Sequence, residues 1–225
     1  MRIAKAISDS GICSRRAAEK LILDGKVKIN GEIIASPAIN VSEDDKVEVD
    51  GRVIPNKPDL RIWLYHKPPA FITTYNDPQG RPTIFENLPK NMPKVISVGR
   101  LDIQSEGLLI LTNSGDFARQ MELPSSNIKR TYTVKTFGAF DLAKIKTSEK
   151  GITIDGEFFR PESISLVESK GINSIFEVIL TEGKNREIRK IFAHFGLSIT
   201  KLIRTEYGQY KLGGLKSGHV LEIRQ

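Results

Sequence analysis

The sequence is poor in the features that stabilise secreted proteins or anchor proteins in membranes. It contains one cysteine, Cys13, so no intramolecular disulfide can form, which is typical of a reducing compartment. The longest apolar run near the middle of the chain, Leu108–Leu111, is far too short to cross a bilayer. Residues 1–12 mix charged and apolar side chains and contain no hydrophobic signal-peptide core. We therefore expect a cytoplasmic protein that is not bound to a membrane.

The motifs of many well-known catalytic and metal sites are also missing. There is no phosphate-binding loop ending in Gly-Lys-Ser/Thr, and no Gly-x-Gly-x-x-Gly pattern that opens a helix after a strand. Neither a His-Glu-x-x-His zinc motif nor a Gly-x-Ser-x-Gly nucleophile elbow occurs. Three histidines and one cysteine do not easily build a structural zinc site.

What the chain does contain is a globular composition with an excess of positive charge. It has 225 residues, of which 39% are hydrophobic and 27% charged, and its formal net charge is +7. Residues 1–28 hold seven Lys or Arg and three Asp or Glu, residues 29–58 hold three and six, and residues 182–225 hold nine and four. The two basic ends fit either ordinary solvated helix faces or a divided binding surface for a polyphosphate backbone.

Residues 1–54 predict a compact helix–helix–hairpin unit. Helices are expected over 2–10 and 15–24, the second capped by Ser14 and ended by Gly25. Alternating residues predict strands at 26–29 and 46–49, followed by Asn-Gly and Asp-Gly turns. The residues expected to face inward from the two helices are Ile3, Ala6, Ile7, Ala17, Ala18, Leu21 and Ile22.

The remainder of the chain predicts an α+β fold with a mixed, mostly antiparallel sheet flanked by a few helices. A stiff Pro-containing linker at 55–58 separates the two parts, which we place at 1–57 and 58–225. Strands are expected at 61–66, 95–98, 108–111, 130–136, 151–160, 163–167 and 174–180, with two or three more after 199. Helices are expected at 117–122 (capped by Asp116), 141–150 and 186–195.

Three stretches of this second part are unusual. An acidic residue, Asp102, sits beside glycines between two hydrophobic strands, and Tyr132 shares a strand face with Arg130 and Val134. The third stretch, 182–190, is a Gly-containing loop that enters a helix with several cations. Cations at a helix N-terminus oppose the helix dipole, so a purely structural explanation is weakest there.

Together these stretches resemble the ribosomal-RNA pseudouridine synthases that carry an N-terminal S4 RNA-binding domain. The resemblance covers essentially the whole chain, because residues 2–51 match S4 and the later motifs match the catalytic domain in order and spacing. The matching catalytic motifs are Lys67-Pro68, Asp77-Pro78, Gly80-Arg81-Pro82-Thr83, Gly99-Arg100-Leu101-Asp102, Lys129-Arg130-Thr131-Tyr132, Asn185–Arg189 and Lys201-Leu202-Ile203-Arg204.

The resemblance implies a role for each matching position. Asp102 corresponds to the essential aspartate, Tyr132 to the tyrosine that stacks on the target base, and Arg189 to the cation that pairs with the aspartate. It further implies substrate binding by Leu202, Arg100, Arg204 and Lys67. RNA contacts are implied for Arg15, Arg16, Lys20, Lys26, Lys28, Lys184 and Arg186. Asn185-Arg186-Glu187 departs from the His or Gln pair that relatives often have, so the contacts to flanking RNA are expected to differ.

The implied reaction also agrees with the missing motifs. Isomerising uridine breaks a C1′–N1 bond and makes a C1′–C5 bond without redox change or loss of a group, so the resemblance implies no cofactor and no metal. The carboxylate could attack C1′, attack C6 of the base, or act after removal of a sugar proton, and the sequence favours none of these routes. The expected partner is ribosomal RNA, free or in a pre-ribosomal particle, and we expect a monomer.

Two alternatives stay open at this point. The same fold could serve as a non-catalytic RNA-binding factor in ribosome assembly, which the two basic ends would suit. The same enzyme could also act on small-subunit rather than large-subunit RNA. The loop Asp77–Thr83 is closer to the large-subunit branch of the family, so we favour that substrate.

Overall fold

The computed structural model describes residues 1–42 and 44–223. Its contacts divide the chain into two compact units. The first unit contains Met1–Arg61 together with the short segments Asn91–Ile96 and Thr112–Gly115, and the second contains the rest of the chain. The sequence-based boundary at 57/58 differs from this division by four residues, in the linker without helix or strand that follows β4 (Arg52–Val53).

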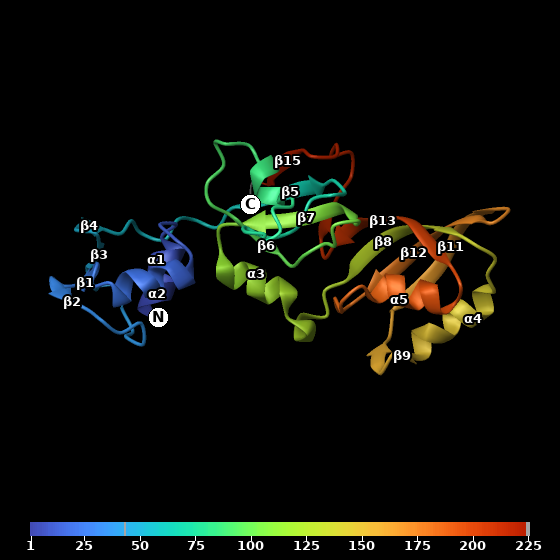
Figure 1. The fold of residues 1–225 in the computed structure, drawn as a ribbon, viewed down its shortest axis with the longest axis horizontal. Helices are drawn as coiled ribbons and strands as arrows, with labels where there is room; N and C mark the ends of the chain where they lie inside the picture. The colour runs from blue at the N-terminus through green and yellow to red at the C-terminus, as the bar shows by residue number, and fades with distance from the viewer. Residues whose placement is uncertain (43, 224–225) are drawn as a thin grey trace. The chain divides into compact units, whose positions relative to one another are not determined.

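Two helices and a small sheet form the first unit (Figure 1). Helices α1 (Ile3–Asp9) and α2 (Arg15–Leu23) pack against each other. The four-stranded antiparallel sheet has the order β2-β1-β3-β4 within the described residues, and its strands are β1 (Val27–Ile29), β2 (Glu32–Ile33), β3 (Val47–Val49) and β4 (Arg52–Val53).

Local sequence signals account for most of this unit. The Ser14 hydroxyl accepts a hydrogen bond from the Ala17 amide at 3.2 Å and caps α2, and Gly25 follows the helix with φ +69°. Ile3, Ile7 and Ile22 are fully buried in its core, as expected. The predicted inward position of Ala17 is wrong, because this residue lies in the first turn of α2, where its side chain is exposed.

The second unit contains, among the described residues, a nine-stranded sheet ordered β11-β12-β8-β13-β7-β5-β15, with β14 beside β13 and β6 beside β7 (Figure 1). The strands are β5 (Ile62–Lys67), β6 (Ile96–Val98), β7 (Glu106–Thr112), β8 (Arg130–Phe137), β11 (Ser163–Lys170), β12 (Asn173–Leu180), β13 (Ser198–Tyr207), β14 (Tyr210–Lys211) and β15 (Val220–Ile223). The predicted mixed, mostly antiparallel α+β architecture is confirmed.

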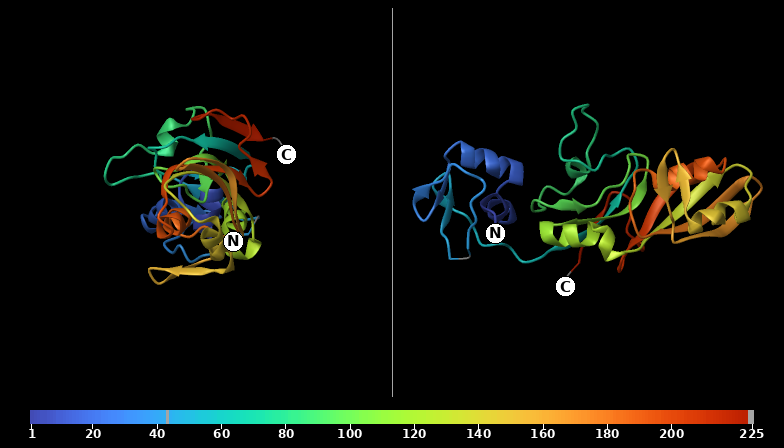
Figure 2. Two further views of the ribbon diagram at one scale, coloured as in Figure 1. Left: turned by 90° about the vertical axis from the view of Figure 1, so that its right-hand side faces the viewer. Right: turned by 90° about the horizontal axis from the view of Figure 1, so that it is seen from below.

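Helices α4 (Leu142–Lys146) and α5 (Glu187–His194) lie on the same face of the β11–β13 part of the sheet (Figure 2). Phe176 of β12 explains this packing, since its ring contacts Phe140 before α4 and Phe192 of α5, with centroids 5.2 Å apart in both pairs. Edge-to-face pairs of this kind are favourable beyond the apolar area that they bury.

Three sequence-based boundaries in this unit need correction. Helix α3 runs from Gly115 to Glu122, so Asp116 lies in its first turn and not at its cap. The expected strand 151–160 is a hairpin of β9 (Ile152–Ile154) and β10 (Glu157–Phe159), because Asp155 and Gly156 both adopt positive φ and form a turn. The expected helix 141–150 is α4 followed by a 3₁₀ turn over Thr147–Lys150; further 3₁₀ turns cover Ile84–Asn87 and Pro124–Ser126.

Strands β7 and β13 join the β11-β12-β8-β13 part of this sheet to the β7-β5-β15 part, and they position the candidate site. They run parallel and pair through Ile203 with Glu106 and Arg204 with Gly107, whereas β13 and β8 pair along eight positions. The loop before β7 carries Asp102, while β8, β13 and α5 carry the other residues that the sequence singles out. The site is therefore assembled across a short strand junction.

Candidate active site

Asp102 lies in the loop between β6 and β7, and the backbone of this loop is tied on both sides. Gly99 adopts φ +68° and donates its amide to Glu122 Oε1 at 2.6 Å. The Leu101 carbonyl accepts a hydrogen bond from the Thr73 hydroxyl at 3.1 Å. The Ser105 amide closes the turn by donating to the Asp102 carbonyl at 3.0 Å. The acidic side chain is thus presented from a fixed backbone, one third exposed.

Two arginines from the start of α5 face the Asp102 carboxylate. Oδ2 lies 3.6 Å from Arg186 Nη1 and 3.9 Å from Arg189 Nε. Arg189 also donates from Nη2 to the Gln104 carbonyl at 3.3 Å and to the Ser105 hydroxyl at 3.4 Å. The expected Asp102–Arg189 pair is therefore present. Arg186, expected only among the RNA contacts, lies nearer to the carboxylate than Arg189 does.

The environment of Arg189 combines burial with repulsion. Burial and the nearby charge of Arg186 lower the pKa of Arg189 from its usual value, and the Asp102 carboxylate opposes that shift. An arginine nevertheless keeps its charge at neutral pH. The Asp102 carboxylate accordingly faces two guanidinium groups, with Oδ2 less than 4 Å from a nitrogen of each.

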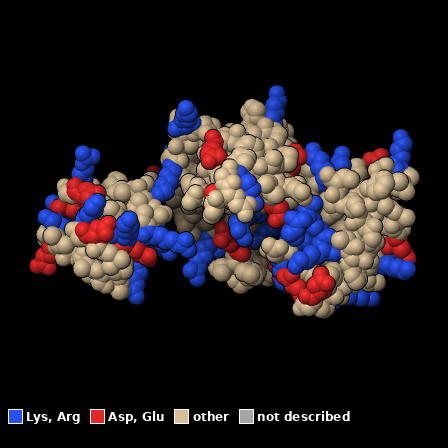
Figure 3. All heavy atoms as spheres, viewed as in Figure 1, with Lys and Arg blue, Asp and Glu red and all other residues tan. Residues whose placement is uncertain are grey.

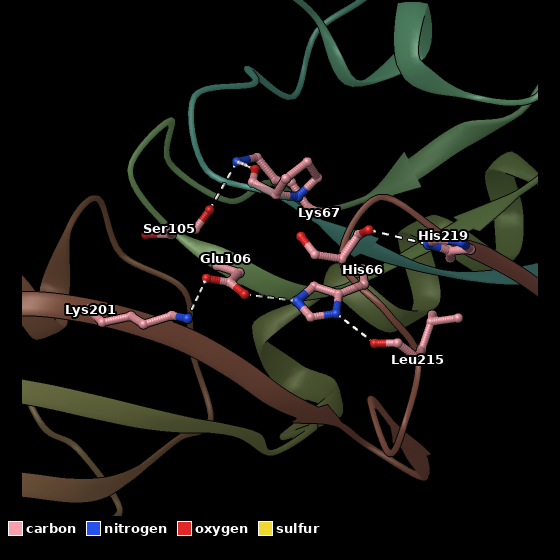
Figure 4. A network of polar contacts seen from close by, with 9 residues as sticks. His66, Lys67, Ser105, Glu106, Lys201, Leu215 and His219 are labelled. Carbon is pink, nitrogen blue, oxygen red and sulfur yellow. Dashed lines mark hydrogen bonds and ion pairs between the residues drawn. The ribbon is translucent and has the colours of Figure 1, made fainter.

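Lys67, expected to bind substrate, instead contacts the backbone of the Asp102 loop, and Figure 4 shows its bond to Ser105. Its side chain is fully buried, and Nζ donates to the carbonyl oxygens of Pro68, Asp102 and Ser105 at 2.9–3.1 Å. Burial lowers the pKa of Lys67 to about 8, although the charges of Asp102 and Glu106 oppose this. All three ammonium donors are used on backbone, so this residue fixes the Asp102 loop and does not face the cavity.

A cavity of about 890 Å³ opens in front of Asp102. This is within the roughly 300–1,000 Å³ typical of small-ligand sites. Tyr132 and Leu202 both line it, and both are otherwise buried, so they offer flat and apolar surface to a guest. Lys and Arg side chains gather between the α3–β7 region and α5 on the face shown in Figure 3. The cavity thus joins an apolar slot to a positive rim.

Two further arginines reach this cavity from the sheet. Arg204 is 3% exposed and donates from Nε to the Leu108 carbonyl at 2.7 Å, while its Nη2 has no hydrogen-bond partner in the described part of the chain. Arg130, predicted only as part of a matching motif, is 6% exposed and donates to Tyr207 Oη at 2.9 Å and to the Thr181 carbonyl at 2.8 Å. Its strand neighbours were apparent from the sequence, but its contacts to distant segments were not.

The start of α5 contains a buried acid that sequence reasoning missed. Glu187 is 2% exposed, and neither carboxyl oxygen has a hydrogen-bond partner among the described residues. Burial, reinforced by the nearby charge of Glu182, raises the pKa of Glu187 to about 7. Arg186, immediately before it, adopts φ +52°. A charged residue beside a helix start usually signals a cap, so a fully buried acid was not expected here.

The outer wall of the cavity is polar. Asp77 receives two hydrogen bonds from the Arg81 side chain and one from its amide, all at 2.8–3.0 Å, which hold the pKa of Asp77 at about 2. Arg100 is exposed and lines the same cavity, and its role as a substrate contact stays a prediction. Lys184 also lines the cavity and donates to the Phe158 carbonyl and to Glu182 at 2.7 Å.

The predicted RNA-binding residues of the first unit form a set of their own. Arg15, Arg16 and Lys20 are exposed along α2, Lys26 is exposed just before β1, and Lys28 is half-buried on β1. No helix in the described residues is long and apolar enough to span a bilayer. In the same part of the chain, no group of three or more His, Cys, Asp or Glu side chains converges as a metal site would require.

Comparison with known proteins agrees with this geometry. The family described as RNA pseudouridylate synthase matches residues 61–194, and the S4 domain matches residues 1–47. An uncharacterized RNA pseudouridine synthase of Rickettsia prowazekii (strain Madrid E) is 54% identical over 222 residues, 99% of this chain and 94% of that protein. The ribosomal large subunit pseudouridine synthase B of Yersinia pestis is 34% identical over 229 residues, 99% of this chain and 72% of the relative.

Solved structures show the same fold. The crystal structure of a pseudouridylate synthase matches with a TM-score of 0.69 at 24% identity, covering 100% of this chain and 96% of that one. The chain therefore belongs to the RNA pseudouridine synthases, isomerases that in this case carry an N-terminal S4 RNA-binding domain.

Proposed function

We propose that the protein converts one uridine of large-subunit ribosomal RNA to pseudouridine, with Asp102 as the acting carboxylate. The observation that carries the proposal is the Asp102 side chain, held by Arg186 and Arg189 at the wall of a cavity of about 890 Å³ lined by Tyr132 and Leu202. The choice of large-subunit RNA is supported by the 34% identity to the Yersinia pestis synthase B over 99% of this chain.

The reaction requires a negatively charged group that can contact the reacting nucleoside. The C1′–N1 bond breaks, a C1′–C5 bond forms, one proton leaves C5 and one arrives at N1, so atoms and charge balance without a cofactor. A carboxylate stabilises or traps an electron-poor ribose carbon, as it does in glycoside hydrolysis. The reaction uses the negative charge of Asp102, and the guanidinium groups of Arg186 and Arg189 lie 3.6 and 3.9 Å from Oδ2 as its counter-ions.

The target base has to leave its RNA stack to reach Asp102. Enzymes that act on a base extrude it into a pocket and accept the cost of unstacking, a few kcal/mol. Tyr132 provides an aromatic surface for the extruded uracil, and Leu202 provides an apolar one. Both surfaces also retain the free base while it turns from N1 to C5.

Two unused donors support nucleotide binding in the same cavity. Among the described residues, Arg204 Nη2 and Arg189 Nε are buried without a hydrogen bond, and Arg189 Nε contacts Asp102 Oδ2 only at 3.9 Å; both arginines line the cavity. Buried polar groups are hydrogen-bonded in most folded proteins. A uracil carbonyl or a phosphate oxygen would satisfy these donors, which accounts for their burial without a hydrogen bond to the protein.

The experiment compares [5-³H]uridine-labelled transcripts of large- and small-subunit ribosomal RNA. Tritium release, followed by mapping of pseudouridine, is expected on one site of the large-subunit transcript. Asp102→Asn is expected to lower kcat by at least about 10⁴-fold, the scale of losing a nucleophile. Asp155→Asn is the matched control, since it removes the same charge from an exposed turn that tolerates asparagine.

Each outcome of this experiment tests a separate part of the proposal. Reaction on the small-subunit transcript alone would overturn the substrate choice and leave the chemistry intact. A fully active Asp102→Asn enzyme would overturn the role of Asp102. Tight binding without tritium release from either transcript would instead favour an RNA-binding factor that uses the synthase fold as a clamp.

A further inference from the structure

The reacting groups come from two parts of one sheet. Asp102 precedes β7, which lies beside β5, whereas Arg189 belongs to α5 and Leu202 to β13, which lies beside β8. The distance between the Asp102 carboxylate and its cations therefore depends on how β7 is held against β13. Any slack at this junction would change the 3.9 Å separation of Asp102 Oδ2 from Arg189 Nε.

The backbone junction is short and unusually close. The two strands pair at Glu106 with Ile203 and at Gly107 with Arg204. A Cβ atom at Gly107 would meet the Arg204 carbonyl oxygen at 2.3 Å and its nitrogen at 2.6 Å, so only glycine allows this approach. Gly107 also has φ +113°, which side chains disfavour.

Glu106 bridges the junction with its side chain (Figure 4). Oε1 lies 3.1 Å from His66 Nε2 on β5, and Oε2 lies 3.0 Å from Lys201 Nζ on β13. His66 Nδ1 in turn lies 2.7 Å from the Leu215 carbonyl. One carboxylate thus connects the strand that ends at Lys67 and the strand that carries Leu202 and Arg204.

We propose that Glu106 is a positioning residue for the isomerisation: it locks β7 between β5 and β13 and so sets the distance between Asp102 and its arginines. It does not face the cavity, and it acts only through the strands that it joins. Burial by itself would raise the pKa of Glu106, but hydrogen bonds from Lys201 and His66 outweigh it and lower the pKa, so the carboxylate stays ionised at neutral pH.

Partial burial makes the contacts of Glu106 with His66 and Lys201 stronger than a surface ion pair. Glu106 is 13% exposed and His66 11%, so solvent screens their contact weakly, whereas Lys201 is 46% exposed. Removing one partner of a buried polar pair leaves the other without its hydrogen bond. A neutral amide at position 106 removes the charge that pairs with the Lys201 ammonium, and only one of its two ends can accept a hydrogen bond.

The test uses the full-length chain and two readouts. For Glu106→Gln we expect kcat for tritium release to fall between about 10- and 100-fold, the scale of a misplacement near 1 Å, with KM for the RNA within about twofold. Hydrogen exchange of the amides at 106–108 and 203–205 is expected to rise at least about tenfold, while β8–β12 amides keep their protection.

Variants of Lys201 and a matched control separate positioning from general destabilisation. Lys201→Met should reproduce the Glu106→Gln phenotype, Lys201→Arg should restore kcat to within about threefold, and the double variant Glu106→Gln/Lys201→Met should be no worse than either single. Glu206→Gln, which breaks the ion pair of Glu206 with Lys211 on the same sheet, should leave both readouts unchanged.

The hydrogen-exchange measurement needs no substrate, so it tests whether Glu106 holds β7 against β13 even if the proposed ribosomal substrate is wrong. Unchanged exchange at the junction in Glu106→Gln would overturn the proposal, as would a kcat within twofold of wild type on an RNA that the wild-type enzyme modifies. A uniform rise of exchange throughout the sheet would also overturn it, because Glu106 would then stabilise the fold without positioning the site.

Discussion

Lys67 shows how a residue type can be recognised while its role is not. A lysine followed by proline after a strand matches the family motif, and a cation near an RNA substrate suggests a phosphate contact. The structure directs Nζ to three backbone carbonyls, two of them in the loop of Asp102. Carbonyl oxygens and the nearby carboxylates keep this cation tolerable in a buried position.

At this position we predict that Lys67→Met lowers both stability and rate. The loss of three hydrogen bonds from one buried donor is expected to reduce the free energy of unfolding on the order of 3 kcal/mol. Urea titration followed by the fluorescence of Trp63, the single tryptophan, measures it. Lys135→Met, at an exposed position of β8, is the control and should change stability by less than about 0.5 kcal/mol.

Helix α5 brings charge and burial together at the scale of an element. Its N-cap residue Arg186 and Arg189 of its first turn face Asp102, although cations are disfavoured at a helix start. Glu187 lies between them in the sequence, yet its side chain is buried. An acid in the first turn offsets the unfavourable placement of the arginines, but burial makes its ionisation costly.

The pH dependence of stability should report on Glu187. The pKa of Glu187 in the folded protein, about 7, lies above the ordinary value of 4.5. Its protonated form therefore contributes fully to the free energy of unfolding below about pH 4.5, and this contribution is lost as the pH rises through about 7. Glu187→Gln removes this component. The free energy of unfolding of the variant, measured relative to that of the wild type, should therefore rise on the order of 3 kcal/mol between pH 4.5 and pH 8. Urea titrations of both proteins at each pH measure the difference, and a constant difference would contradict the assignment.

Strand β7 should not tolerate a methyl group at Gly107. Gly107→Ala forces a clash with the Arg204 backbone and adds strain at positive φ, so we expect a loss on the order of 3 kcal/mol in stability and a large fall in kcat. Gly156→Ala also has positive φ but has open space around it. That control should cost only about 1 kcal/mol by thermal unfolding.

At the scale of the whole molecule, we predict that the RNA contacts are divided between the two units. Arg15 and Arg16 are exposed on the S4 unit, and the cavity and its cations lie in the synthase unit. Phosphate contacts supply affinity that depends on salt, whereas contacts around the extruded base determine the chemistry. Binding and turnover should therefore be separable by mutation.

Salt dependence measures this separation. Arg15→Gln/Arg16→Gln is expected to weaken RNA binding and to reduce the slope of log K against log salt by about 1 for each phosphate that is no longer neutralised, with kcat at saturating RNA unchanged. Lys144→Gln/Lys146→Gln removes the same charge from exposed positions on α4 and should keep the slope. Equal slopes for both double variants would mean that α2 does not bind phosphate.

Local chemistry determined a large share of this protein. Caps, Asn-Gly and Asp-Gly turns and the alternation of apolar residues act over a few positions, which is why both units and most helices and strands were predictable from the sequence. Motif order likewise identified Asp102, Tyr132 and Arg189 as candidates. What only the tertiary structure decided is the set of interactions between distant segments: Arg186 beside Asp102, Lys67 bonded to its loop, Glu187 in the interior, and Glu106 across the β7–β13 junction. Burial and hydrogen-bond partners are properties of the assembled sheet, so no local pattern could assign them.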